Sequence, residues 1–206
     1  MSMSVKEAIE ARHSVRSFTA EPVSEEMLQS LLEAARQAPS SLNSQPWRFK
    51  VVTDAETRAW IASSEVSKRQ GWLADAPAIL VCCADLEGYV RDTQASAFFF
   101  RENKVLDEEP TRGIQEYADQ QEAASETARF GAAALNVGLA VSQLMLRAVE
   151  LGLGTCWVGM FDEGPLRERF GLAPEQRVVC LLAVGHPDEA AVPARKRKSL
   201  DDIVLK

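Results

Sequence analysis

Two arginines, a histidine and a serine occur close together near the start of the chain, in the run Arg12-His13-Ser14-Val15-Arg16. A guanidinium presents a rigid fork of N–H donors that matches phosphate or carboxylate oxygens, and such charge-assisted hydrogen bonds are strong. A second basic run, Arg195-Lys196-Arg197-Lys198, lies near the other end of the chain. Together the two runs predict a site for a small planar or phosphorylated anion. The alternative is that each run is a solvated, charged stretch of surface.

The chain as a whole is acidic, so the basic runs are local features. It has 206 residues, enough for a single domain (1–206), and a formal net charge of −7. We therefore expect neither nucleic acid nor an anionic membrane as a partner. The longest apolar run, 130–146, is interrupted by polar residues and is too short to span a bilayer. Residues 1–12 lack the apolar core of a signal peptide, and four cysteines without C-x-x-C spacing indicate buried, reduced thiols, which predicts a cytoplasmic protein.

Hydrophobic periodicity predicts more helices than strands. The expected helices are 4–12, 24–38, 54–65, 127–150 and a turn at 165–170; the expected strands are 48–53, 78–84, 178–185 and, as a short strand or loop, 155–160. Ser24 and Thr127 are the expected N-caps of two of these helices. Residues 39–47 form a polar loop between prolines. Residues 85–126 show no strand and only a polar, helix-like stretch, and Phe98–Phe100 are expected in the core. This pattern predicts an α+β fold.

Several common kinds of active site are absent from the sequence. Neither His13 nor His186 has a second histidine or a cysteine pair at ligand spacing, so no metal site is expected. The glycine-rich run 152–157 begins like a dinucleotide-binding loop, but Trp157 occupies the position of its third glycine. No nucleophile has an evident neighbouring base. This inventory favours a protein whose chemistry belongs to a bound cofactor, and no side chain is assigned a catalytic role.

Five segments, in this order along the chain, resemble the FMN-dependent nitroreductase family: 11–18, 38–47, 152–159, 184–187 and 195–200. The resemblance covers residues 5–84 and 127–205 and is weak over 85–126. It implies a nitroreductase-like fold, with helices around a central, mainly antiparallel sheet. It also implies an intertwined homodimer, with the 127–150 helix at its centre and flavin at the interface. The variable segment 85–126 would form a substrate lid.

The resemblance also implies which residues bind FMN. The phosphate, ribityl chain and pyrimidine edge would be held by Arg12, His13, Ser14 and Arg16. Arg197 would complete the phosphate clamp, with Arg195 as the alternative. The partner subunit would contribute Pro39, Ser40, Ser41, Asn43 and Gln45. The isoalloxazine ring would be lined by Cys156, Trp157, Val158 and Gly159. Larger family members carry a Glu-Gly pair where this chain has Gly159-Met160, which leaves the contact at Gly159 open.

The implied activity is that of an FMN-dependent NAD(P)H oxidoreductase. NADH or NADPH would pass hydride to the flavin, and a nitroaromatic, quinone or similar acceptor would then receive it, in a ping-pong sequence. Two alternatives stay open. A reductive dehalogenase-like flavoenzyme of the iodotyrosine type shares the Lys196-Arg197-Lys198 ending, and a non-catalytic flavin-binding dimer is the other. The plainer interpretation of Cys156 and Trp157 is that they are core residues, and that of 39–47 is a simple helix-to-strand connection.

Overall fold

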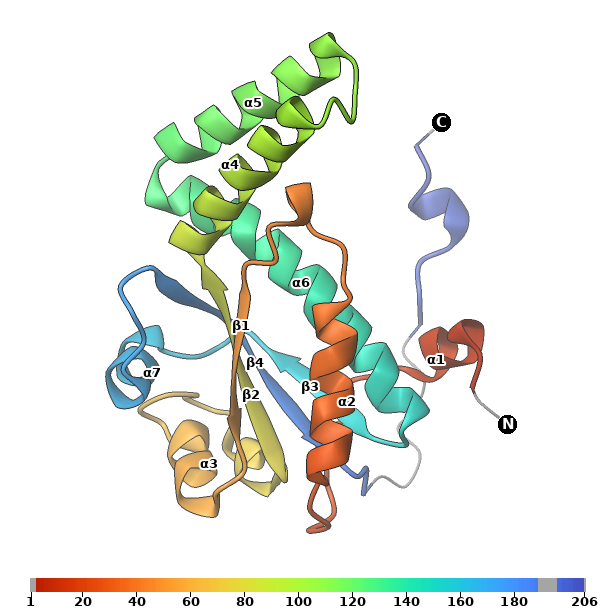
Figure 1. Cartoon of the computed structure of the whole chain (residues 1–206). Coiled ribbons are helices and arrows are strands. Elements are labelled where there is room, and N and C mark those ends of the chain that lie inside the picture. The colour runs from red at the N-terminus through yellow and green to blue at the C-terminus, as the bar shows by residue number, and fades with distance from the viewer. Residues whose placement is uncertain (1–2, 189–195, 206) are drawn as a thin grey trace.

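A four-stranded antiparallel sheet lies at the centre of the protein in the computed structural model, which describes residues 3–188 and 196–205 (Figure 1). The strand order is β1-β2-β4-β3. The strands are β1 (Trp47–Val52), β2 (Ala78–Asp85), β3 (Gly154–Val158) and β4 (Gln176–Gly185). β2 and β4 occupy the middle of the sheet, which explains why both are almost continuous apolar runs. The predicted α+β class is confirmed.

Helices cover both faces of the sheet. They are α1 (Val5–Ala11), α2 (Glu25–Arg36), α3 (Ala55–Ala62), α4 (Leu86–Glu102), α5 (Glu108–Ala123), α6 (Glu126–Glu150) and α7 (Glu163–Phe170), with short 3-10 turns η1 (Ser41–Asn43), η2 (Gly71–Asp75) and η3 (Leu200–Asp202). Along β2, Leu80 and Cys82 belong to the core that α2 and α6 complete, whereas Val81 belongs to the core completed by α3 and α7. The alternation of side chains along the strand thus builds two cores, one on each face (Figure 1).

The helix ends follow capping chemistry. Ser24 caps α2 as expected, because its hydroxyl accepts a hydrogen bond from the Met27 amide at 3.2 Å. The prediction that Thr127 caps the long helix is wrong. α6 begins at Glu126, and the hydroxyl of Ser125 accepts from the Ala128 amide at 3.3 Å. Two hydroxyl residues as close as Ser125 and Thr127 cannot be told apart by spacing alone, and in the structure the earlier one makes the capping hydrogen bond.

α6 is the longest element of the described chain and the spine of the fold. By length and composition it could cross a membrane. However, Val137, Val141 and Leu144 are fully buried against the sheet and α2, as in the core helix of a globular protein. Leu135, on another side of the helix, leaves 70% of its surface exposed. The helix therefore has one face for the core of this chain and one face that this chain does not cover.

Residues 86–123 form a helical hairpin, α4 and α5, that extends beyond the sheet (Figure 1). The prediction that Phe98–Phe100 lie in the core is wrong for the first two, which are each 56% exposed. The buried face of α4 carries Tyr89, Thr93 and Ala97 at four-residue spacing. Phe98 and Phe99 follow Ala97 directly, so the helical rotation turns them outward.

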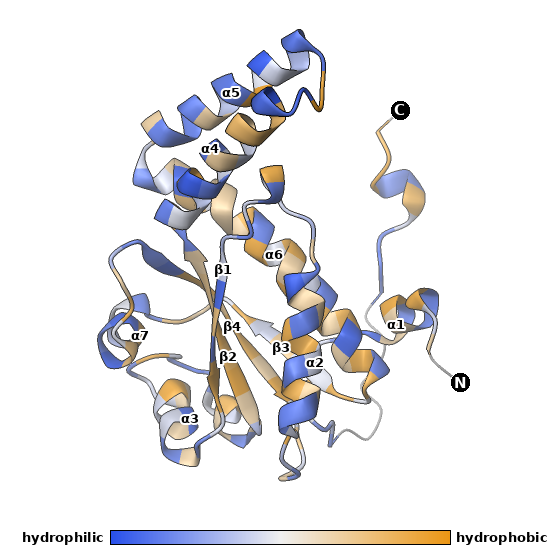
Figure 2. Cartoon of the chain, viewed as in Figure 1, coloured by the Kyte–Doolittle hydropathy of each residue, from blue (hydrophilic) through white to orange (hydrophobic). Residues whose placement is uncertain are grey.

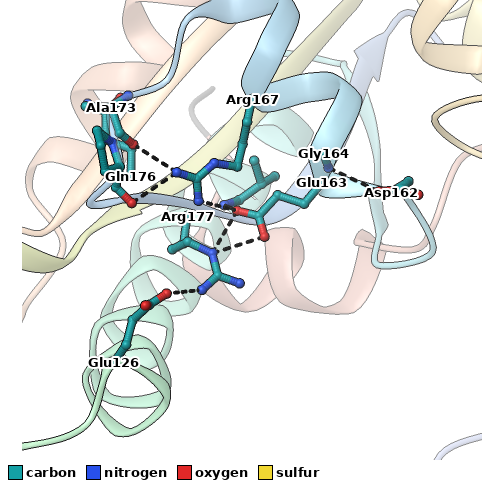
Figure 3. A network of polar contacts seen from close by, with 10 residues as sticks. Glu126, Asp162, Glu163, Gly164, Arg167, Ala173, Gln176 and Arg177 are labelled. Carbon is teal, nitrogen blue, oxygen red and sulfur yellow. Dashed lines mark hydrogen bonds and ion pairs between the residues drawn. The ribbon is translucent and has the colours of Figure 1, made fainter.

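A charged network fastens α7 to the sheet and to the start of α6 (Figure 3). The Glu163 carboxylate accepts a hydrogen bond from the Val178 amide at 2.8 Å and from the Arg177 guanidinium at 3.0 Å. Arg177 also pairs with Glu126, the first residue of α6. This network joins the consecutive elements α7 and β4 to the start of α6, on the side of the fold where α7 lies.

Candidate functional site

The N-terminal basic motif lies alongside β3. Ser14 forms a parallel bridge with Thr155, and the Val15 amide donates to the Thr155 carbonyl at 3.0 Å. Val15 is buried, at 2% exposure. Because side chains alternate in an extended segment, burying Val15 turns Ser14 and Arg16 away from the core. The backbone therefore presents Ser14 and Arg16 together on one side.

Gly154 allows this close approach. A Cβ atom added at Gly154 would lie 2.6 Å from a methyl carbon of Val15, which is too close for any side chain. The glycine is therefore required by the contact between the two segments. Beside them, a depression of about 200 Å³ is lined by His13, Val149 and Pro187 among others. The motif, the end of α6 and the segment after β4 meet at this point.

The cations of the motif act on a buried thiol. Burial raises the pKa of Cys156, whereas the charge of Arg16, a hydrogen bond with Ser14 and the charge of Arg12 act in the opposite direction. The structure thus brings Arg12, Ser14 and Arg16 close to Cys156, as the sequence analysis predicted for one site. The raised pKa keeps the thiol neutral near pH 7, so Cys156 is not an activated nucleophile.

Trp157 provides accessible apolar surface on the strand that the basic motif flanks. Trp157 is 39% exposed, although its neighbours Cys156 and Val158 are buried in the core. Gly159 follows at the end of the strand, and a Cβ added there would meet only the Trp157 ring nitrogen, at 3.9 Å. Cys156 and Val158 can therefore offer a ligand mainly their backbone, whereas Trp157 and Gly159 offer accessible surface.

The loop before β1 is built differently, from strained backbone. Leu42, Asn43 and Gln45 all have positive φ angles, 48°, 54° and 44°. This left-handed conformation is unfavourable for residues other than glycine and persists only where surrounding contacts impose it. Within the loop, the Ser40 hydroxyl accepts from the Gln45 amide at 3.0 Å, and the Gln45 side chain donates to the Asn43 carbonyl at 3.1 Å. These angles and hydrogen bonds give the segment a defined shape, and its contact with flavin stays a prediction.

Asn136 of α6 is a positioning residue that the sequence analysis missed. It is 4% exposed, and its side-chain oxygen accepts from the Ser41 amide at 2.8 Å. Its side-chain nitrogen donates to the Ala132 carbonyl at 2.8 Å. In the sequence Asn136 only interrupts an apolar run. Its position on the expected buried face of an apolar helix could have indicated a positioning role, because buried polar groups are nearly always hydrogen-bonded.

The two halves of the predicted site lie at different places along α6. The loop contacts α6 at Asn136, whereas the basic motif shares its depression with Val149, thirteen residues further along. At 1.5 Å per residue the two positions are about 20 Å apart. One chain therefore assembles Arg12, Ser14 and Arg16 with residues 156–159, but keeps the loop 39–45 separate from them.

The remaining predicted residues are accessible. Pro39 and His13 are exposed, and the His13 ring nitrogen Nδ1 lies 3.0 Å from the Ala11 carbonyl oxygen. Arg197 is exposed and forms no hydrogen bond or ion pair with another described residue. Its convergence with Arg12 stays a prediction, and Arg195 lies outside the described residues. No group of three or more metal-ligating side chains occurs in the described chain.

Comparisons with known proteins agree with one another. The Nitroreductase family profile matches residues 9–186. The chain is 33% identical to a protein named NADH dehydrogenase from Thermus thermophilus, over 98% of this chain and 96% of that one. It is 26% identical to iodotyrosine deiodinase 1 of Rattus norvegicus, over 97% of this chain and 68% of that one. A solved structure described as a nitroreductase in complex with FMN, from Exiguobacterium sibiricum, superposes with a TM-score of 0.80 at 25% identity, covering 100% of this chain and 98% of that one.

Proposed function

Because the chain belongs to the nitroreductase family, we propose that it is an FMN-dependent NAD(P)H oxidoreductase that works as a homodimer in the cytoplasm. The observation that carries the proposal is the placement of Arg12, Ser14 and Arg16 beside β3 and close to Cys156, on a strand whose next residue, Trp157, has an exposed ring. A cluster of cationic donors beside a flat apolar surface suits a ligand with a phosphate and a planar ring. FMN has both.

The described residues fit FMN in chemistry as well as in position. Arg12 forms no ion pair with any described residue, so its guanidinium is available to a phosphate. We assign the phosphate and ribityl contacts to Arg12, His13, Ser14, Arg16 and Arg197. We assign the ring contacts to the segment 156–159, where Trp157 excludes water and the backbone amides can donate to the ring edge. The partner subunit would add Pro39, Ser40, Ser41, Asn43 and Gln45.

Bound FMN would supply the hydride chemistry, accepting hydride from NADH or NADPH and passing it to a nitroaromatic, quinone or similar acceptor in a ping-pong sequence. The protein would orient the nicotinamide and then the acceptor at the same face of the flavin. Its cations would stabilise negative charge that develops nearby, in a setting that Trp157 partly shields from water. Cys156 adds no charge, because its thiol stays protonated.

A second copy of the chain would complete the site. Val5 of α1 and Leu135 of α6 are 72% and 70% exposed, and Ile203 to Leu205 of the C-terminal segment are also exposed. Figure 1 shows this segment clear of the helices and the sheet, and Figure 2 shows apolar residues on it and on α1. Exposed apolar surface of this extent is typical of a protein interface. The separation of the two site halves along α6 supports the same conclusion, since a partner could place its loop 39–45 opposite the basic motif.

The second candidate function is reductive dehalogenation of the iodotyrosine type. The similarity to an iodotyrosine deiodinase over nearly the whole chain favours it. The α4–α5 hairpin, which extends past the sheet, would serve as the substrate lid in either function (Figure 1). The two functions differ in the acceptor and share the flavin site, so turnover with different acceptors distinguishes them.

The test begins with the purified protein and added FMN. We expect a yellow complex with micromolar or tighter affinity, and loss of flavin absorbance when NADH or NADPH is mixed with it in a stopped-flow instrument. Steady-state turnover with nitroaromatics, quinones and halotyrosines would then identify the acceptor. A protein that stays colourless with FMN would contradict the proposal. A flavin that neither nicotinamide bleaches would support a non-catalytic flavin-binding dimer.

A further inference from the structure

Both tyrosines of the chain meet where the α4–α5 hairpin approaches the loop 39–45. The hydroxyls of Tyr89 on α4 and Tyr117 on α5 lie 2.6 Å apart. The Ser41 hydroxyl donates to the Tyr117 hydroxyl at 3.4 Å. Burial and the contact with Tyr117 raise the pKa of Tyr89, whereas Ser41 lowers it. Tyr89 is therefore a neutral hydroxyl at every physiological pH, and the three groups form a short chain of hydrogen bonds.

Ser41 is the loop residue that this chain of hydrogen bonds reaches. Its amide is held by Asn136 at 2.8 Å and its hydroxyl by Tyr117. The next two residues, Leu42 and Asn43, have left-handed backbones. A strained turn keeps its shape only through contacts made from outside. α6 supplies one of these contacts through Asn136, and the hairpin supplies another through Tyr117.

Tyr117 also faces open space. Together with Leu42, Gly113 and Ile114 it lines a depression of about 320 Å³ between the loop and α5. Tyr117 is half-buried, whereas Tyr89 behind it is fully buried. The more exposed member of the pair, Tyr117, accepts the Ser41 hydrogen bond at 3.4 Å, and the buried member, Tyr89, fixes its position.

We propose that Tyr117 is a positioning residue for the flavin-binding loop. Anchored by Tyr89, it holds Ser41 so that the placement of the α4–α5 hairpin determines how well residues 40–45 grip FMN. This inference rests on the proposed function, in which these loop residues contact the flavin. It assigns the hairpin a second role besides covering the substrate, because movement of the hairpin would change flavin affinity.

The test compares Tyr117→Phe with a control on the same helix. Tyr117→Phe removes the hydroxyl and keeps the ring. Gln115→Ala is the control, because the Gln115 side chain donates to Gln94 of α4 at 3.1 Å and to Asp119, and has no hydrogen bond with a described loop residue. FMN affinity would be measured by quenching of flavin fluorescence on titration with apoprotein. We expect Tyr117→Phe to weaken binding about two- to tenfold, the change that one neutral hydrogen bond contributes. Gln115→Ala should bind like the wild type.

A double-mutant cycle tests whether Tyr117 acts through Ser41. Once Ser41→Ala has removed the donor, adding Tyr117→Phe should cost no further affinity. Thermal unfolding of the apoproteins should show Tyr117→Phe somewhat less stable than Gln115→Ala, because the buried Tyr89 hydroxyl also loses its partner. The proposal is overturned if Tyr117→Phe binds FMN like the wild type, if Gln115→Ala weakens binding equally, or if the two losses in the cycle simply add. Wild-type protein that binds no FMN would instead contradict the proposed function itself.

Discussion

The two halves of the candidate site are held in place by different physical means. Main-chain pairing with β3 and close steric contact between Val15 and Gly154 position the basic motif. Side-chain hydrogen bonds from Asn136 and Tyr117 position the loop 39–45, whose backbone is strained. In the first half these contacts are made by the main chain and by Val15, and not by the side chains proposed to bind the ligand. In the second half, the residues that shape the site are also buried parts of the structure.

This difference separates affinity from stability. Exposed charged residues can be replaced with little change in the free energy of unfolding, so their loss should appear in ligand binding alone. Buried polar residues leave unsatisfied partners when they are removed, so their loss should appear in both quantities. Three of the substitutions that follow test this contrast directly, and a fourth lies outside both halves; they are given in order of expected effect.

Gly154→Ala should have the largest effect, because it attacks the steric basis of the first half. The new methyl would clash with Val15 and push the basic motif away from β3. We expect the free energy of unfolding to fall by about 1–3 kcal/mol, as for other overpacked sites, and FMN binding to be lost or strongly weakened. Urea unfolding and FMN titration would measure the two effects. Gly164→Ala is the control, because a Cβ there meets only the Asp162 carboxylate, at 3.4 Å. It should change the free energy of unfolding and FMN affinity little.

Arg12→Ala should weaken FMN binding without destabilising the fold. A hydrogen bond to a charged group contributes about 1.5–3 kcal/mol, which corresponds to roughly tenfold to a hundredfold in affinity. Since Arg12 has no described ion-pair partner, the unfolding free energy should stay within about 0.5 kcal/mol of the wild type. Arg91→Ala, which removes an equal charge from exposed surface near Asp92, controls for net charge. Equal losses of FMN affinity in both variants would mean that Arg12 acts only through long-range charge.

Asn136→Ala should reduce both quantities together. The Ser41 amide and the Ala132 carbonyl would each lose a partner in a mostly buried setting, at a cost of about 1–3 kcal/mol in unfolding free energy. The loop should then grip FMN less well. Gln143→Ala, on the same helix, removes a side chain that makes no hydrogen bond with a described residue and should be mild. If Asn136→Ala lowers stability but leaves FMN affinity intact, the loop does not contact the flavin and the contrast between the halves fails.

Glu163→Gln should have the smallest effect and should act on stability alone. Glu163 pairs with Arg177 beside α7, in a network whose labelled members include no residue of either half of the site (Figure 3). The side-chain oxygen of the new glutamine can still accept a hydrogen bond from the Val178 backbone N–H, so only the charge interaction is lost. We expect this to lower the free energy of unfolding by about 1 kcal/mol, because the pair is partly exposed. The loss should shrink at high salt, because salt screens accessible ion pairs. A change in FMN affinity without salt dependence would show that this network also reaches the site.

Local patterns were enough to predict most of the sheet and the helices that cover it. Apolar runs followed or preceded by prolines predicted β2 and β4, and the capping serine predicted the start of α2. The association of the basic motif with residues 156–159 was predicted only through a resemblance of ordered motifs, which carries information about contacts that spacing does not. The family profile supports that resemblance over residues 9–186.

The sequence by itself determined the elements of this protein and the kinds of side chain its site can offer, because hydrophobic period, capping and charge are local properties. The tertiary structure decided which of these side chains meet. It exposed Phe98 and Phe99, placed the loop about 20 Å along α6 from the basic motif, and gave Asn136 and Tyr117 their contacts with Ser41. These outcomes depend on how α4, α5 and α6 pack against one another. Packing joins residues far apart in sequence, so no local pattern could specify them.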